Sequence, residues 1–294
     1  MLREQHGQAT CVDDGLRVLR PERVQVGRVV DERRHDAPPG RHRNSRLGGH
    51  RRRCYRPRIV ELVRSALVIQ HEPDGPAALA ADRLVHHGFD LTTLQVLDWG
   101  STLSDVEFPD PLSFDLIVTT GSMHSVYDHD RIGSWISREI DMLRSAHAAD
   151  TAIFGICFGA QALCVALGGT VERAPSSEVG WIEVESDDES IVPGGPWFTW
   201  HDDRCVLPSG VADLARSPIA PQAFRSGAAM AVQFHPEAHR DLVAGWMSKC
   251  DDAYFVERGA DRTVMLDGFD RNGALAEANL HSMLDRFIDE EVGR

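Results

Sequence analysis

Short apolar runs alternate with stretches of helical spacing along the middle of the chain. The runs, bounded by turn residues, predict strands at 66–70, 91–97, 114–119 and 151–156. The stretches between them, where apolar side chains recur every three or four positions, predict helices at 76–87, 131–146 and 160–167. Strands that alternate with helices build βαβ units. We therefore expect an α/β fold with a mostly parallel central sheet and helices on both faces.

After Thr170 the pattern becomes rich in strands and turns. Apolar runs predict further strands at 181–186, 197–200 and 229–234. Helical spacing returns after Arg240, and the chain ends in a predicted helix near 274–288. No stretch approaches 18 consecutive apolar residues, so the sequence predicts no membrane-spanning helix and no membrane partner.

Charge divides the chain near Arg58. The 294 residues carry a formal net charge of −14, which argues against a nucleic-acid or membrane-surface binder. Residues 1–58 nevertheless hold 15 arginines against 7 acidic residues, a net of +8, which leaves −22 for the remainder. This first segment shows no sustained apolar period, so we predict a basic, disordered N-terminal extension over 1–58 and a folded domain over 59–294. A basic tail that binds nucleic acid is the alternative interpretation.

The 6 cysteines and 14 histidines raise the question of disulfides and metal sites. The cysteines show no C-x-x-C spacing and no small-domain disulfide framework, and no N-terminal apolar segment resembles a secretory signal. We therefore expect reduced thiols in a cytoplasmic protein. We expect no metal and no other cofactor, because no His, Cys or carboxylate cluster has metal-ligand spacing. His71, His124 and His239 are interpreted as ordinary loop or partner-facing residues.

The strongest chemical signal is the segment Gly-Ile-Cys-Phe-Gly-Ala-Gln at 155–161, where a predicted strand ends and a helix begins. Gly155 and Gly159 permit the sharp turn that places the side chain of Cys157 above the sheet edge. At a helix N-terminus the dipole and free N–H groups stabilise a thiolate, and the N–H of Phe158 is well placed for an oxyanion. The turn alone is equally typical of a small buried residue in glycine-rich packing.

A second signal follows the strand predicted at 229–234. His235-Pro236-Glu237 comes directly at the end of that strand. A thiol nucleophile needs a base, and the base needs a group that orients it, so His235 and Glu237 suit these two roles. Because the carboxyl ends of parallel strands meet at one edge, we expect His235 to lie close to Cys157.

Together these motifs resemble the class I glutamine amidotransferases, a family with a flavodoxin-like sheet. The family pattern is a G-x-C-x-G-x-Q elbow followed further along the chain by H-P-E, and here His235 follows Cys157 by 78 residues. The resemblance runs from about Leu67 to about Trp246 and implies a three-layer flavodoxin-like sandwich with a nucleophile elbow. It implies that Cys157 attacks the side-chain amide of glutamine, that His235 transfers protons, and that a γ-glutamyl thioester forms. Glu237 would orient the imidazole.

Other positions resemble the family less strictly. Gln161 falls where family members hold the amino-acid end of the substrate, and Gly180 and Trp181 lie in a segment that contacts the α-carboxylate through its backbone. Gly121 and Ser122 follow the strand at 114–119, where the family usually has Gly-Gly-Pro and supplies the second oxyanion donor. The serine leaves that N–H available. Gln161 as an exposed helix residue and Trp181 as a core residue are the alternative interpretations.

The resemblance also bears on partners. Only 57 residues follow Glu237, too few for an ATP-binding synthetase domain. We therefore expect a stand-alone glutaminase, similar to the glutaminase domain of GMP synthase, that supplies ammonia to a separate synthetase partner. The alternatives are a γ-glutamyl amide hydrolase, a DJ-1-like cysteine peptidase and a catalytically silent regulatory domain. The H-P-E motif argues against the peptidase, and the presence of Cys157, His235 and Glu237 together argues against a silent domain.

Overall fold

The secondary structure follows the alternation that the sequence predicts. The structure, a computed structural model, describes residues 63–292, so the extension predicted over 1–58 lies outside the described residues. The strands are β1 (Arg64–Gln70), β2 (Phe89–Gln95), β3 (Leu116–Thr119), β4 (Ala152–Ile156), β5 (Thr170–Ser186), β6 (Gly195–Val206), β7 (Ala212–Arg216), β8 (Pro221–Ser226) and β9 (Ala229–Val232). The helices are α1 (Ala78–His86), η1 (Pro111–Ser113), α2 (His129–Ile132), α3 (Ile136–Ala148), α4 (Phe158–Ala166), α5 (Arg240–Met247), α6 (Asp252–Glu257) and α7 (Arg262–Glu291).

The strands of the described chain form a 9-stranded sheet in the order β2-β1-β3-β4-β9-β8-β7-β5-β6. The strands from β2 to β9 in this order pair in parallel, and those from β9 to β6 pair antiparallel. The parallel half confirms the predicted α/β fold. It also brings the C-terminal ends of β1, β3, β4 and β9 to one edge, which is where open α/β sheets place their sites.

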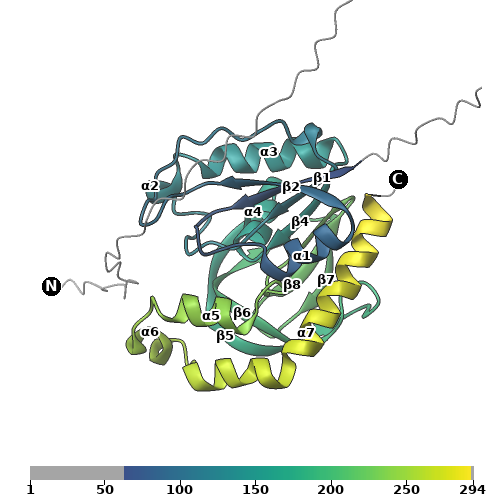
Figure 1. Ribbon diagram of the computed structural model, residues 1–294. Helices are drawn as coiled ribbons and strands as arrows, with labels where there is room; N and C mark the ends of the chain where they lie inside the picture. The colour runs from purple at the N-terminus through teal and green to yellow at the C-terminus, as the bar shows by residue number, and fades with distance from the viewer. Residues whose placement is uncertain (1–62, 293–294) are drawn as a thin grey trace, which may run out of the picture. The chain divides into compact units, whose positions relative to one another are not determined.

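Helices cover both faces of the parallel half and give three layers (Figure 1). Side chains of successive strand residues point to opposite faces. In β1, Ala66 and Val68 join a core shared with α1 and α7, whereas Leu67 and Ile69 join a core shared with α3 and α4. Each fully buried aliphatic side chain of this kind contributes about 1.5–3 kcal/mol relative to an exposed one.

The long helix α7 is tied to α1 by charge as well as by packing. The Asp285 carboxylate accepts hydrogen bonds from Arg83 Nε at 2.6 Å and from His87 Nε2 at 2.7 Å. The bonds from Arg83 and His87 hold the pKa of Asp285 at about 2, below its ordinary value. Between these two helices the ion pair fixes the end of α7 over the sheet.

One predicted helix is wrong. The helix expected over 131–146 is divided into α2 and α3, with a break from Gly133 to Trp135. An ideal Cβ on Gly133 would lie 2.4 Å from the carbonyl oxygen of His129, so the chain closes tightly where α2 ends. Ile132 and Ile136 on either side of the break are both buried, so the apolar period continues across it and hides it.

The antiparallel half was predicted only in part. The strand expected at 181–186 is the C-terminal end of β5, which begins at Thr170, and the strand expected at 197–200 lies inside the longer β6. β7 and β8, with the sequences ADLAR and PQAFRS, were not predicted, because neither has a clean apolar alternation.

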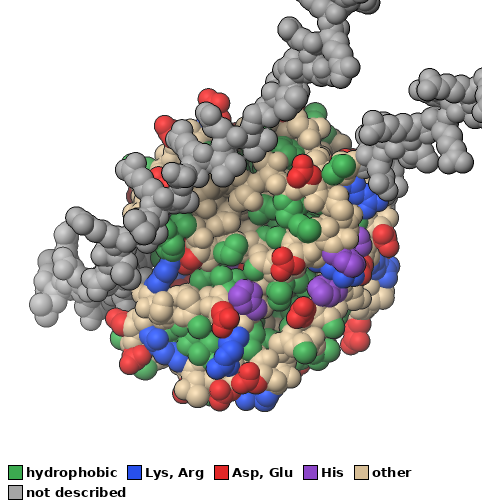
Figure 2. Space-filling view, viewed as in Figure 1, with side chains coloured by type: hydrophobic (Ala, Val, Ile, Leu, Met, Phe, Trp, Pro, Cys, Tyr) green, Lys and Arg blue, Asp and Glu red, His purple; other side chains and the backbone are tan. Residues whose placement is uncertain are grey.

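Charge and apolar length can be inspected on the described part of the chain. Acidic and basic side chains are interspersed over the face shown in Figure 2. Among residues 63–292, no helix combines the length and the apolar character that a membrane crossing needs.

Candidate active site

Cys157 stands at the turn between β4 and α4, at the edge where the parallel strands end. Its φ of 51° and ψ of −105° are unusual for a residue with a side chain, and its N–H donates to the carbonyl of Val232 in β9 at 2.8 Å. The flanking glycines make this turn possible. An ideal Cβ on Gly159 would lie 2.1 Å from the carbonyl oxygen of Thr119, and one on Gly155 would lie 3.0 Å from backbone atoms of Gly159. The sequence motif is therefore a steric requirement of the elbow.

His235 and Glu237 lie directly after β9 and form a buried pair. The Nδ1 of His235 is 2.7 Å from Oε1 of Glu237, and the two residues are 6% and 1% exposed. Burial by itself lowers the pKa of His235. The negative charges of Glu237 and of a Cys157 thiolate, with hydrogen bonds to both, raise that pKa well above its ordinary value. The arrangement thus favours the charged form of the His235 ring.

Two backbone N–H groups, those of Phe158 and Ser122, are the predicted oxyanion donors. Phe158 is the first residue of α4, so its N–H has no intrahelical acceptor. An ideal Cβ on Gly121 would lie 3.0 Å from Cε1 of His235 and 3.8 Å from Cβ of Cys157, so the Gly121–Ser122 loop adjoins the pair. The N–H of Ser122 has no hydrogen-bond acceptor among residues 63–292. Both positions stay predictions as oxyanion donors: Phe158 follows Cys157 in the chain, and Gly121, which precedes Ser122, adjoins Cys157.

Gln161 is buried behind the nucleophile rather than exposed on its helix. Its Nε2 donates to Oε1 of Gln233 at 3.3 Å, and Nε2 of Gln233 donates to Sγ of Cys157 at 3.6 Å. The sequence reasoning missed Gln233. A polar residue inside an apolar strand, two positions before His235 and so on the same face, was the signal that could have found it.

The two other substrate-binding candidates lie on β5. Gly180 has φ of +116°, a conformation that favours glycine, and its carbonyl accepts a bond from Oγ1 of Thr199 at 3.1 Å. The side chain of Trp181 packs against Phe269 and donates from Nε1 to the carbonyl of Met265 at 3.0 Å. The indole therefore connects β5 to α7, and a contact between this backbone and a substrate carboxylate stays a prediction.

Two further tryptophans line the site and were not predicted as site residues. The carbonyl of Trp200 is 3.8 Å from Sγ of Cys157, which can donate to it. The rings of Trp246 and His235 are 5.1 Å apart, and Nε1 of Trp246 donates to the carbonyl of Asp74 at 2.7 Å. The Trp246 indole therefore packs against the His235 ring, and the Trp200 indole packs behind it against Trp246. Within residues 63–292, no three His, Cys, Asp or Glu side chains are placed to hold a metal ion.

The chain is similar to known proteins in sequence and in fold. The family model described as "Glutamine amidotransferase class-I" matches residues 78–242. A GMP synthase [glutamine-hydrolyzing] of Desulfotalea psychrophila is 33% identical over 139 residues, which cover 43% of this chain and 25% of that protein. One from Limosilactobacillus reuteri is 32% identical over 190 residues, covering 60% and 32%. The chain thus matches between a quarter and a third of the length of these relatives.

Solved structures show the same fold. A glutamine amidotransferase from Thermotoga maritima superposes with a TM-score of 0.67 at 21% identity, covering 77% of this chain and 98% of that one. One from Methylobacillus flagellatus has a TM-score of 0.68 at 20% identity and covers 77% and 95%. In both superpositions about a quarter of this chain has no counterpart in the solved structure. The shared part includes the domain that contains the site.

Proposed function

This chain belongs to the class I glutamine amidotransferase family, and from that membership we propose that it hydrolyses the side-chain amide of glutamine and supplies the ammonia to a separate acceptor enzyme. The observation that carries the proposal is the elbow at Cys157 beside the buried pair of His235 and Glu237, whose nitrogen and oxygen are 2.7 Å apart. A nucleophile, a base and an orienting carboxylate in this arrangement suit acyl transfer.

The first half of the reaction forms a thioester. The thiolate of Cys157 attacks the amide carbon, and the carbonyl electrons move to oxygen, where the N–H groups of Phe158 and Ser122 stabilise the negative charge. The imidazolium of His235 gives its Nε2 proton to the amide nitrogen as the C–N bond breaks. Ammonia leaves, and a γ-glutamyl thioester stays on the sulfur.

The second half returns the enzyme to its starting state. His235, now neutral, accepts a proton from water as the water oxygen attacks the thioester carbon. The C–S bond breaks, glutamate leaves, and the thiolate is restored beside the imidazolium. Throughout, the Nδ1–H of His235 donates to Glu237, which keeps Nε2 directed at the reacting atoms.

The acceptor enzyme and the cellular compartment belong to the proposal as well. The relatives named GMP synthase [glutamine-hydrolyzing] are named for a synthesis that hydrolyses glutamine, which supports an acceptor enzyme for the ammonia. Cys157, Cys164 and Cys205 are buried free thiols, which supports a reducing compartment such as the cytoplasm.

The test is release of ammonia and glutamate from glutamine by the purified chain, with Cys157→Ala as the blank. Hydroxylamine added during turnover should trap the acyl group as γ-glutamyl hydroxamate. We expect both products from the wild type and neither from the variant. Equal ammonia release by wild type and Cys157→Ala, or release without any hydroxamate, would contradict the proposed thioester route.

A further inference from the structure

A second buried pair of histidine and glutamate lies beneath the active-site loop. His71, at the end of β1, and Glu139, on α3, are both 0% exposed, and Nε2 of His71 is 2.9 Å from Oε2 of Glu139. The other carboxylate oxygen accepts a bond from Oγ1 of Thr119 at 2.8 Å. The sequence had suggested an ordinary loop histidine. Burying two charged groups costs desolvation free energy, which indicates that the pair has a role other than stability.

The other ring nitrogen of His71, Nδ1, also has a hydrogen-bond partner. Its Nδ1 is 3.2 Å from the carbonyl oxygen of Gly121, in the loop that adjoins Cys157. Both partners of the ring are acceptors, and only the doubly protonated imidazolium can donate to both. Burial by itself lowers the pKa of His71, but the Glu139 carboxylate raises it above its ordinary value, which agrees with a charged ring.

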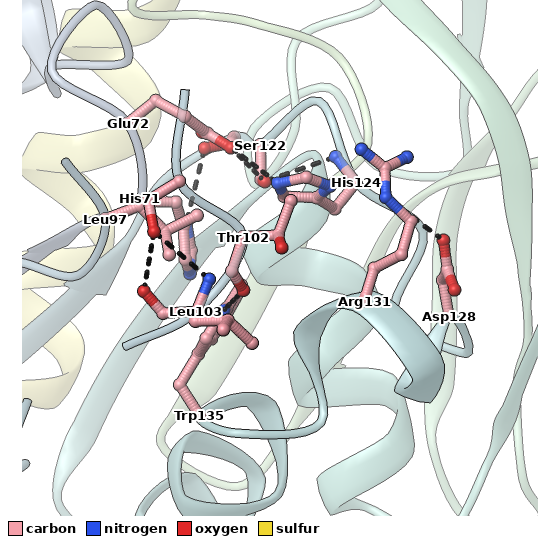
Figure 3. A network of polar contacts seen from close by, with 12 residues as sticks. His71, Glu72, Leu97, Thr102, Leu103, Ser122, His124, Asp128, Arg131 and Trp135 are labelled. Carbon is pink, nitrogen blue, oxygen red and sulfur yellow. Dashed lines mark hydrogen bonds and ion pairs between the residues drawn. The ribbon is translucent and has the colours of Figure 1, made fainter. Parts of the chain in front are cut away.

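The next residue holds the same loop from its other end. Oε1 of Glu72 accepts a hydrogen bond from Oγ of Ser122 at 2.7 Å. Figure 3 shows the side chains of Glu72 and Ser122 meeting, with His124 beside them and His71 on the adjacent side. Nε2 of His124 is 3.6 Å from Oε1 of Glu72. Ser122, which stands where the family usually has glycine, is thus held by Glu72, two residues after the end of β1.

The peptide bond between Gly121 and Ser122 links the direction of the Gly121 carbonyl to the direction of the Ser122 N–H. It is trans, so its C=O and N–H point in opposite directions. With the carbonyl drawn toward His71, the N–H of Ser122 faces the opposite side. The Cα of Gly121 already adjoins His235 and Cys157 there, as the ideal-Cβ distances of 3.0 and 3.8 Å show.

We propose that His71, held by Glu139, is a positioning residue: its Nδ1–H fixes the Gly121 carbonyl so that the N–H of Ser122 is aimed at the oxygen of the acyl group bonded to Cys157. This inference rests on the proposed thioester chemistry. A donor must be in place before charge develops on that oxygen, since reorienting it during the reaction would cost the stabilisation that the hole supplies.

Two substitutions separate the two hydrogen bonds of the ring. The amide nitrogen of an asparagine lies near the place of an imidazole Nδ1, and that of a glutamine near the place of Nε2. His71→Asn therefore retains a donor for the Gly121 carbonyl and loses the bond to Glu139. His71→Gln does the reverse. Thermal unfolding of each variant reports any general loss of structure.

Two thiol reactions separate positioning from structure. Acetylation of Cys157 by p-nitrophenyl acetate passes through an oxyanion, whereas alkylation by iodoacetamide does not. We expect His71→Gln to lower the acetylation rate by about tenfold or more and to leave alkylation within about twofold. His71→Asn should keep both rates within about threefold of the wild type, even where its unfolding temperature is the lower of the two. Cys157→Ala gives the blank for both reagents.

The outcomes are distinct. A His71→Gln protein that acetylates like the wild type, or loses acetylation and alkylation equally, would overturn the proposal. If His71→Gln does not fold, His71→Asn decides, because a selective tenfold loss of acetylation in that variant is equally contrary. Glutamine turnover is measured in parallel. A wild type that shows none contradicts the proposed function, while the ratio of acetylation to alkylation still tests the positioning role.

Discussion

Replacing Glu237 by glutamine tests how the carboxylate acts on His235. The amide can still accept the bond from Nδ1–H that spans 2.7 Å in the wild type, so the ring should keep its orientation. What is lost is the charge that raises the pKa of His235. A hydrogen bond to a charged group contributes about 1.5–3 kcal/mol. Since each 1.4 kcal/mol is a factor of about ten in rate, we expect kcat to fall about 10- to 150-fold.

The pH dependence of the unfolding free energy shows whether Glu237 stabilises the charged or the neutral form of His235. The pKa of His235 is raised in the folded protein, so the stability that its charged form contributes is present below about pH 6.5 and is lost as pH rises through the raised value. In Glu237→Gln the imidazolium should discharge at lower pH. The difference in unfolding free energy between wild type and variant should therefore shrink above neutral pH.

The assay follows kcat for glutamine hydrolysis and the unfolding midpoint in urea from about pH 5.5 to 9. Glu290→Gln is the control, because it also removes one carboxylate, bonded to Arg225 at 2.8 Å, and lies away from the site. That control should keep kcat within about twofold of the wild type. A Glu237→Gln protein with kcat within threefold of the wild type and superimposable pH profiles would refute the reasoning.

Three other outcomes are expected. Cys157→Ala and Cys157→Ser should lose covalent labelling by diazo-oxo-norleucine, whereas Cys164→Ala should retain it, because the Cys164 sulfur is buried against backbone carbonyls; mass spectrometry of the labelled peptide decides. Gly159→Ala should lower the unfolding free energy in urea by about 3 kcal/mol, since its Cβ would overlap the carbonyl of Thr119, and a wild-type midpoint would contradict this. Asp285→Asn should flatten the acid limb of the stability curve between about pH 4 and 2, because a depressed carboxyl pKa stabilises above its unfolded value and is lost as pH falls; an unchanged limb would count against it.

The site residues could be predicted from the sequence where a short motif by itself determines the local geometry. A side chain would overlap the Thr119 carbonyl at Gly159 and would be tightly crowded at Gly155, so the glycines of the motif indicate the turn directly. His235 and Glu237 are two residues apart and need only a strand end to meet. His71 and Gln233 escaped prediction, because their partners lie on other elements and only the assembled sheet brings them together.

The fold divides in the same way. The central parallel strands β1, β3 and β4 contain continuous apolar runs buried on both faces, and such runs can be recognised in the sequence. β7 and β8 pair with each other, and β8 pairs with β9, across short turns, but their mixed polar and apolar residues specify the strands weakly. The break at Gly133 was hidden because the buried isoleucines on both sides keep the helical period.

The indole of Trp246, 5.1 Å from the ring of His235, gives the protein an internal optical reporter. A charged imidazole quenches the fluorescence of a nearby indole more strongly than a neutral one. Because the pKa of His235 is raised, this tryptophan should be dim at neutral pH and brighten as the ring loses its proton. The other 5 of the 6 tryptophans form the background, which the spectrum of Trp246→Phe subtracts. Acylation of Cys157 removes the negative charge on sulfur that helps to raise the pKa of His235. Formation of the thioester should therefore be accompanied by a transient increase in Trp246 fluorescence.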